Sequence, residues 1–195
     1  ITYNYGASNI VASGTCGENL TWTLDVDGTL TIDGIGDMTN YPDSESVPWN
    51  KYAPNIKKFI IEKGVTSVDG LAFCDCINLT HITVDKNNAR YSSDENGILF
   101  NKDKTILEIF PPASILTSYT IPSSVSGISS LAFSNCSNLT SVTIPDSVVI
   151  IGSLAFDDCS SLTSITVDEN NKYYLNDEYG VLFNKDKTTL IKYPA

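Results

Sequence analysis

The chain repeats one pattern, VSGISSLAFSNCSNLTSVTI at 125–144 and VVIIGSLAFDDCSSLTSITV at 148–167, with a period of 23 residues. A third copy, VTSVDGLAFCDCINLTHITV, occupies 65–84. A unit this short cannot bury its own apolar edge, so the copies must stack against one another. Eight apolar positions recur in every copy, and at 125–144 they are Val125, Ile128, Leu131, Phe133, Cys136, Leu139, Val142 and Ile144.

The spacing of these positions predicts the shape of each unit. The step of two at the end of each copy indicates a strand, in which alternate side chains face inward. The steps of three suit tight turns or short 3₁₀ segments. Each unit is therefore predicted to be one short strand followed by an irregular or 3₁₀ return path. Leu71, Leu131 and Leu154 are predicted to point into the core.

A longer repeat overlies the first. VDKNNARYSSDENGILFNKDKTILEIFP at 84–111 matches VDENNKYYLNDEYGVLFNKDKTTLIKYP at 167–194. In both, apolar runs flank an Asn-Lys-Asp-Lys turn, which predicts β-hairpins at about 97–110 and 180–193. We expect these hairpins to replace the return path in their coils.

These motifs resemble the BspA-like leucine-rich repeats of bacterial surface proteins. The matching pattern is Leu-x-x-Val/Ile-x-Ile/Val-Pro, then Val-x-x-Ile, then Ala-Phe-x-x-Cys, and the stretch from Gly14 to Trp49 is similar to the entry cap of that family. The resemblance implies an α/β-type leucine-rich repeat fold, a right-handed β-α (β/3₁₀) superhelix solenoid that is β-rich and has an N-terminal β-hairpin cap. It divides one continuous structural domain into a cap at 1–54 and a solenoid at 55–195. It also implies a secreted or cell-surface location and a role in adhesion or protein binding.

Composition excludes two classes of partner. The net charge is −11, and Arg90 is the only arginine, whereas nucleic-acid binding needs clustered basic residues. No apolar run approaches the roughly 18 residues of a membrane helix, so we expect no membrane insertion. The chain begins at Ile1 without a basic-then-apolar leader, so we expect that a signal peptide has been removed.

Few residues suggest catalysis. Asp25 and Asp27 match the nucleophile motif of haloacid-dehalogenase-type phosphatases, which leaves a phosphatase as a remote alternative. That chemistry needs the end of a buried parallel strand, whereas the alternating residues on both sides favour a hairpin with a type I′ turn. His81 is the only histidine, and without partners it cannot form a triad. We therefore expect a non-catalytic protein, with no catalytic or cofactor-binding residues.

The cysteines and acids give no predicted metal site. Cys76, Cys136 and Cys159 share one repeat position and are expected to be buried free thiols, while a Cys16–Cys74 disulfide is a less favoured alternative. Cys74 and Cys76 lack the spacing of a zinc site. Calcium is considered at acids beside the predicted hairpins, but these lack the regular spacing of a calcium loop: Asp94, Glu95, Asp177 and Glu178.

A partner-contact surface is predicted in two places. Outward strand positions form a ladder in which small hydroxyl side chains predominate, and His81 is expected on its exposed face; the ladder residues are Lys58, His81, Thr83, Ser118, Thr120, Ser141, Thr143, Ser164 and Thr166. Tyrosines near the hairpins supply further contacts, namely Tyr91, Tyr173, Tyr174 and Tyr179, and Phe110 is also expected outside the core. The expected partner is a protein, with a glycan as the alternative.

Overall fold

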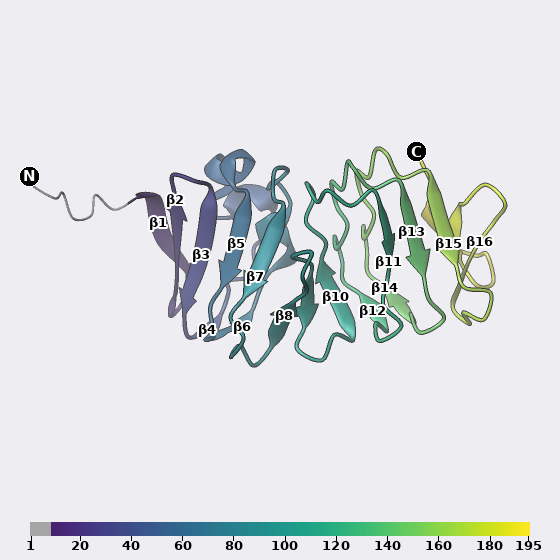
Figure 1. Ribbon diagram of the computed structural model, residues 1–195, viewed down its shortest axis with the longest axis horizontal. Coiled ribbons are helices and arrows are strands. Elements are labelled where there is room, and N and C mark those ends of the chain that lie inside the picture. The colour runs from purple at the N-terminus through teal and green to yellow at the C-terminus, as the bar shows by residue number, and fades with distance from the viewer. Residues whose placement is uncertain (1–8) are drawn as a thin grey trace, which may run out of the picture.

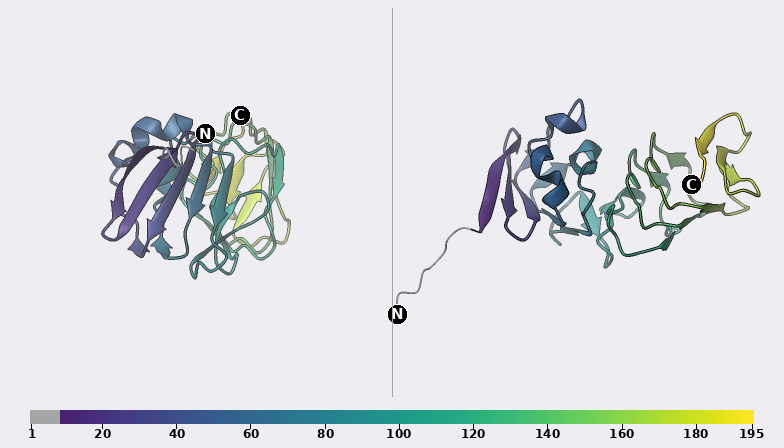
Figure 2. Two further views of the ribbon diagram at one scale, coloured as in Figure 1. Left: turned by 60° about the vertical axis from the view of Figure 1, so that its left-hand side comes forward. Right: turned by 90° about the horizontal axis from the view of Figure 1, so that it is seen from above.

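Short strands succeed one another along the long axis of the molecule, from the N-terminal end to the C-terminal end (Figures 1 and 2). The structure, a computed structural model, describes residues 9–195, so the first eight residues of the predicted cap lie outside it. The chain winds as a β-solenoid of about five turns, built mostly of strands. The solenoid fold predicted from the 23-residue period is confirmed.

The first wall of the solenoid carries two separate sheets. One runs in the order β1 (Ile10–Gly17), β2 (Leu20–Asp25), β3 (Thr29–Gly34), β5 (Lys58–Ile61) and β7 (His81–Val84). Its first three strands are antiparallel, and β3, β5 and β7 are parallel. The other sheet is parallel and contains β11 (Ser118–Thr120), β13 (Ser141–Ile144) and β15 (Ser164–Val167).

Shorter strands form the second wall. A five-stranded sheet has the order β14 (Ile150–Ile151), β12 (Gly127–Ile128), β10 (Ile106–Ile109), β9 (Leu99–Asn101) and β8 (Tyr91–Ser93). A smaller pair consists of β4 (Gly36–Asp37) and β6 (Val65–Ser67). At the C-terminal end, β16 (Tyr174–Asn176), β17 (Leu182–Asn184) and β18 (Leu190–Lys192) form a three-stranded antiparallel sheet.

Both predicted hairpins are present, as β9–β10 and β17–β18. Each gains a third antiparallel strand, β8 or β16, and β10 pairs in parallel with β12. The strand β10 of the first hairpin therefore occupies the place that β12 and β14 hold in the return paths of the plain coils, as expected. Strand pairing over a long sequence separation decides this placement, and local alternation carries no information about it.

The return path agrees with the prediction only in part. Helical structure in residues 9–195 consists of three 3₁₀ segments, η1 (Ser44–Ser46), η2 (Asn50–Asn55) and η3 (Gly70–Phe73), of which η3 lies at a predicted position. At the equivalent positions Leu131 and Leu154 the backbone is left-handed, with φ of 62° and 56°. Turns replace the 3₁₀ segment there.

The prediction that these leucines enter the core is wrong. Leu71 and Leu131 are half-buried and Leu154 is 62% exposed, whereas the alanine after each leucine is buried. The left-handed turn at Leu131 and Leu154 directs the side chain outward and brings the next residue inward. A non-glycine residue in this conformation costs about 1–2 kcal/mol.

The core forms two clusters that meet at the first hairpin. Leu99 and Ile109 belong to the N-terminal cluster, and Phe100, Leu107 and Phe110 belong to the C-terminal one. Strand alternation separates Leu99 from Phe100, whereas a register shift in β10 lies between Leu107 and Ile109. The expectation that Phe110 lies outside the core is wrong, because its ring stacks on Phe133 with centroids 5.2 Å apart. The first hairpin is thus the joint between the two halves of the molecule.

The boundary at residue 54 stays a prediction. Strand β3, from the predicted cap, pairs in parallel with β5, from the predicted solenoid. Trp49 also packs against Phe59 across that boundary, with ring centroids 5.9 Å apart. One core therefore runs through both parts.

Candidate functional site

The first wall is interrupted between β7 and β11, where loops cross the space between the two sheets (Figure 1). After β7 the chain enters the first hairpin, and its loop occupies the next strand position. The amide of Ile82 donates to the carbonyl of Gly97 at 3.0 Å, and that of Val84 donates to Ser93 Oγ at 3.2 Å. The predicted ladder of outward side chains is therefore two ladders, one on β5 and β7 and the other on β11, β13 and β15.

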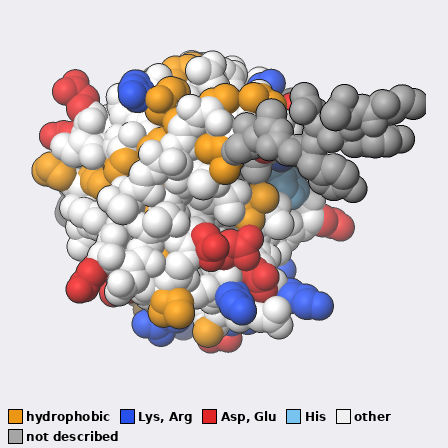
Figure 3. Space-filling model, turned by 90° about the vertical axis from the view of Figure 1, so that its left-hand side faces the viewer, with side chains coloured by type: hydrophobic (Ala, Val, Ile, Leu, Met, Phe, Trp, Pro, Cys, Tyr) orange, Lys and Arg blue, Asp and Glu red, His pale blue; other side chains and the backbone are white. Residues whose placement is uncertain are grey.

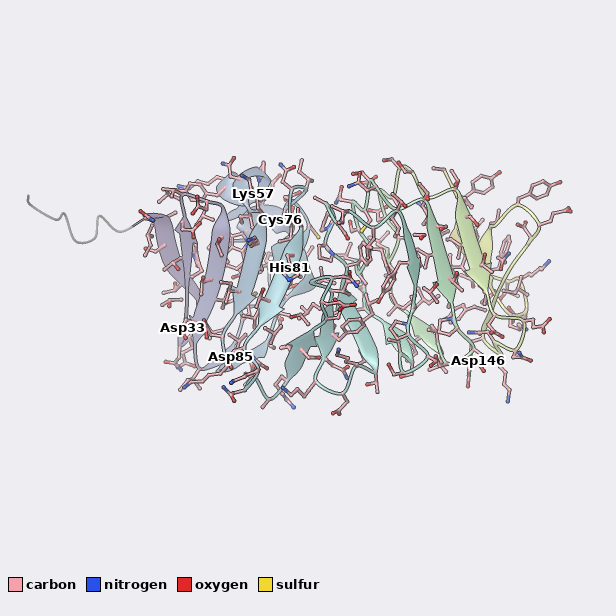
Figure 4. All side chains as sticks on the ribbon, viewed as in Figure 1. Asp33, Lys57, Cys76, His81, Asp85 and Asp146 are labelled. Carbon is pink, nitrogen blue, oxygen red and sulfur yellow. The ribbon has the colours of Figure 1, made fainter. Side chains whose placement is uncertain are left out.

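A cleft of about 530 Å³ lies at this interruption. Outward side chains of β5 and β7 form its floor, and two loop segments form its walls. The size suits a short segment of a ligand rather than a whole domain. Figure 4 shows His81 on β7, on the side that faces the C-terminal half. The lining residues are Lys58, Thr80, His81, Thr83, Glu95, Asn96, Ser114, Ile115 and Leu116.

His81 is packed more closely than the sequence suggests. It is half-buried rather than fully exposed, because Gly97 lies directly against its ring. Gly97 has φ of +72°, and a Cβ atom there would lie 2.3 Å from His81 Nδ1. Only glycine satisfies both the left-handed backbone and this close approach.

The acidic and basic side chains of the cleft have no partners in the part of the chain that the structure describes. Across residues 9–195, neither an ion pair nor a side-chain hydrogen bond is made by Lys58, His81 or Glu95. Ile115 also lines the cleft, and its side chain is 89% exposed. The cleft therefore combines unpaired polar groups with one fully presented apolar side chain, and these groups are free to contact a partner.

A buried asparagine, which sequence reasoning missed, fixes the loop that builds the cleft. Asn88 is 1% exposed, and its Nδ2 donates to the carbonyls of Glu62 at 2.9 Å and Val65 at 3.0 Å. Its Oδ1 accepts from the amides of Arg90 and Tyr91 at 2.8 and 2.9 Å. The repeated Asp-x-Asn-Asn at 85–88 and 168–171 was the available signal.

The repeat and its stacking can now be compared with known proteins. Six copies of the BspA type Leucine rich repeat region match residues 50–96 and 107–186. The chain belongs to the BspA-type leucine-rich repeat family. The resemblance seen in the sequence is therefore confirmed. No curated protein matches the chain.

Solved structures that are similar to this chain come from several bacteria. A leucine-rich repeat protein from Eubacterium ventriosum ATCC 27560 is 21% identical, with 80% of this chain and 72% of that chain covered and a TM-score of 0.39. A leucine rich cell surface protein from Faecalibacterium prausnitzii A2-165 is 21% identical, with 94% and 62% covered and a TM-score of 0.38. The pneumococcal vaccine antigen PcpA is 18% identical, with 96% and 57% covered and a TM-score of 0.41. This chain thus spans less than two thirds of the latter two.

The predicted tyrosine contacts divide into two kinds in this BspA-type chain. Tyr91 and Tyr174 are half-buried, and their hydroxyls accept from the amides of Val68 at 3.1 Å and Ile151 at 2.9 Å. Both tyrosines therefore tie a hairpin coil to the preceding coil. Tyr173 and Tyr179 are 51% and 74% exposed, so their rings are available for contacts.

The aspartates considered as calcium ligands accept hydrogen bonds within turns. Asp94 Oδ1 accepts from the amides of Asn96 and Ile98 at 3.0 and 2.9 Å, and Asp177 Oδ1 does the same for Tyr179 and Val181 at 2.9 Å. Residues 9–195 hold no group of three or more histidine, cysteine or acidic side chains arranged to bind a metal ion. Glu95 lines the cleft, whereas Glu178 is exposed on the second hairpin coil.

Asp25 and Asp27 lie in a hairpin turn, as predicted, but the turn type was wrong. Only Gly28 has positive φ, at 84°, so the loop of Val26, Asp27 and Gly28 is a type I turn followed by a left-handed glycine. Asp25 Oδ1 accepts from the amides of Asp27 at 3.0 Å and Thr29 at 2.7 Å. The nucleophile position of a phosphatase is thus used to hold a turn between antiparallel strands.

All five cysteines are free thiols, in agreement with the prediction for Cys76, Cys136 and Cys159, and the Cys16–Cys74 disulfide is absent. Burial raises the pKa of the Cys16 and Cys74 thiols to about 11 each, and the pKa of Cys136 is also raised by burial. The thiols of Cys16, Cys74 and Cys136 therefore stay protonated at neutral pH and are poor nucleophiles, whereas a hydrogen bond from Cys136 lowers the pKa of Cys159.

Two other surfaces were compared with the cleft. A groove of about 350 Å³ lies between residues 68–71 and 129–131, and Glu108 in it accepts from Ser129 Oγ at 2.5 Å. At the N-terminal end, hydrophobic side chains alternate with polar ones (Figure 3). The groove has no exposed apolar side chain. A hollow of about 450 Å³ at the N-terminal end does place the exposed Val11 and Val26 beside Asp27 and Lys57, but both valines, at 53% and 62%, are less exposed than Ile115 at 89%. No helix in residues 9–195 has the length and apolar character needed to cross a membrane.

Proposed function

We propose that this chain is a non-catalytic, cell-surface or secreted protein-binding module that engages its partner at the cleft between β7 and β11. One observation carries the proposal: within residues 9–195 the side chains of Lys58, His81 and Glu95 line this cleft without partners, beside the 89% exposed Ile115. Ile115 is the most exposed of the large hydrophobic side chains in residues 9–195. Membership of the BspA-type family and the name of the Faecalibacterium neighbour support a surface role.

The direct test is capture of proteins from extracts of host and microbial cell surfaces. Thr83→Trp places a bulky ring on the cleft floor, and Thr166→Trp, at the matching position of β15, is the control. Both positions are exposed, so both variants should fold. We expect the wild type and Thr166→Trp to capture the same protein and Thr83→Trp to lose it. Equal capture by both variants, or none by the wild type, would refute the proposal.

A glycan-binding role is a second candidate because exposed tyrosines gather on the last coil. Tyr179 and Tyr193 are 74% and 68% exposed, and the residues that follow them lie close together, with the Cβ position of Gly180 3.5 Å from Pro194 Cγ. Exposed rings can stack on sugars. A glycan array would show a signal that Tyr179→Ala removes, and a blank array would exclude this role.

A further inference from the structure

The cleft floor carries two basic side chains at neighbouring positions. Lys58 on β5 pairs in register with His81 on β7, which places them side by side on the same face, about 4.8 Å apart at the backbone. In a chain with 23 acids and 12 bases, an acid nearby would be the ordinary arrangement. Glu95, the one acid among the residues that line the cleft, forms no ion pair with either residue.

The strands β13 and β15, which precede the second hairpin coil, show that this basic pair is not required by the fold. The positions that match Lys58 and His81 there are Ser141 and Ser164, which are also paired in register on adjacent strands. The same architecture thus forms with two neutral hydroxyls. Lys58 and His81 are therefore available for an anionic group brought by a partner.

The wall of the cleft adds an apolar requirement. Ile115 is 89% exposed and Leu116 is half-buried, so the occupant must present an aliphatic side chain close to its anionic group. No aromatic residue lines the cleft, so it offers no stacking platform for a sugar. A nucleic acid would be repelled by the net charge of −11. A polypeptide satisfies both requirements with two neighbouring residues.

We propose that the cleft receives an extended peptide segment of the partner protein, in which an Asp or Glu contacts Lys58 and His81 and an adjacent aliphatic residue packs on Ile115. This inference rests on the proposed function and names the chemistry of its partner. A carboxylate between two basic donors forms charge-assisted hydrogen bonds. The volume of about 530 Å³ accommodates a few residues rather than a folded surface.

The test uses a phage-displayed library of random linear dodecapeptides. Peptides are selected on the wild-type chain after depletion on the Lys58→Ser/His81→Ser variant, which copies β13 and β15. A selected peptide and its version with the acid replaced by the amide are then measured by fluorescence anisotropy. Lys63→Ser is the matched control, because Lys63 is exposed and outside the cleft. Ile115→Ser tests the wall independently of the floor.

We expect selected peptides to pair an acid with an aliphatic residue. Their affinity should fall at least tenfold in Lys58→Ser/His81→Ser, in Ile115→Ser and with the amide peptide, and stay unchanged in Lys63→Ser. Failure to select any peptide that depends on the floor residues, or selection of peptides without an acid, overturns the inference. One outcome separates this inference from the proposed function. If Thr83→Trp abolishes the capture of a surface protein and Lys58→Ser/His81→Ser does not, the proposed function stands and the proposed peptide chemistry is wrong.

Discussion

The two hairpin coils, 84–111 and 167–194, share an internal framework and differ in their surroundings. Asn171 repeats all four hydrogen bonds of Asn88, to the carbonyls of Pro145 and Val148 and from the amides of Tyr173 and Tyr174. The Asn-Lys-Asp-Lys turns also match, with Lys104 and Lys187 left-handed at φ of 55° and 59°. Identical residues therefore build the coil itself.

The differences lie where each coil meets its neighbours. Leu107 is fully buried because β10 pairs with β12, whereas the matching Leu190 is 56% exposed because β18 pairs only with β17 in residues 9–195. Gly97 packs on His81, while Gly180 faces Ser164 with looser contacts. The comparison shows which residues hold the hairpin and which adapt it to a neighbour or a cleft.

The largest loss of stability is expected at the buried asparagine that the two coils share. Asn88→Ala or Asn171→Ala removes four hydrogen bonds and takes the asparagine partner from two amides and from the buried carbonyl of Val65 or Val148, so each should lower the free energy of unfolding by about 4 kcal/mol. Guanidinium denaturation measures the loss. Asn87→Ala, at an exposed neighbour, should change it by less than about 0.5 kcal/mol. An equal loss for Asn87 would show that Asn88 is not the anchor.

The next largest loss of stability should differ between the two coils, at the matching leucines of β10 and β18. Leu107→Ala removes a fully buried side chain and should cost about 3 kcal/mol, whereas Leu190→Ala should cost no more than about 0.5 kcal/mol. Leu190→Ala is the matched control, because Leu190 holds the same repeat position as Leu107. Thermal unfolding followed by circular dichroism would detect the difference, and equal costs would mean that a neighbour covers β18 in solution.

Glycine should matter more at the cleft. Gly180→Ala should cost about 1 kcal/mol because of its φ of +77°. Gly97→Ala has the same backbone penalty plus a clash with His81, so its cost should be about 2 kcal/mol. Combining Gly97→Ala with His81→Ser, which copies Ser164, should recover part of the loss. No recovery in urea denaturation would show that the ring is not the obstacle.

The smallest effect concerns pH. Burial raises the pKa of Glu108, whose match in the second coil is Ile191, above its ordinary value of 4.5. Folding therefore takes up a proton between the unfolded and folded pKa values, and stability falls as pH rises through that window. Glu108→Gln should flatten this dependence and be more stable than the wild type at neutral pH. Parallel curves for the two proteins would contradict this account.

Much of the fold followed from periodicity, because steps of two and three residues report which side chains face inward. For Leu131 and Leu154 this rule predicted the wrong direction, because a left-handed turn directs the leucine side chain outward and brings the following alanine inward. The cleft was harder to foresee. Lys58 and His81 were recognised as outward residues, but the loop over Gly97 that ends their sheet depends on pairing between segments distant in the sequence. Ile115, Asn96 and Ser114 carry no local pattern, so their place in the cleft was missed.

The most direct measurement of the central claim is site-specific photocrosslinking. A benzophenone amino acid replaces Asn96 in the cleft or, at the matching position of the second coil, the exposed Tyr179. After illumination with cell-surface extracts, the account predicts a protein adduct at position 96 and none at 179. Equal adducts at both positions, or an adduct at 179 alone, would contradict a partner site between β7 and β11.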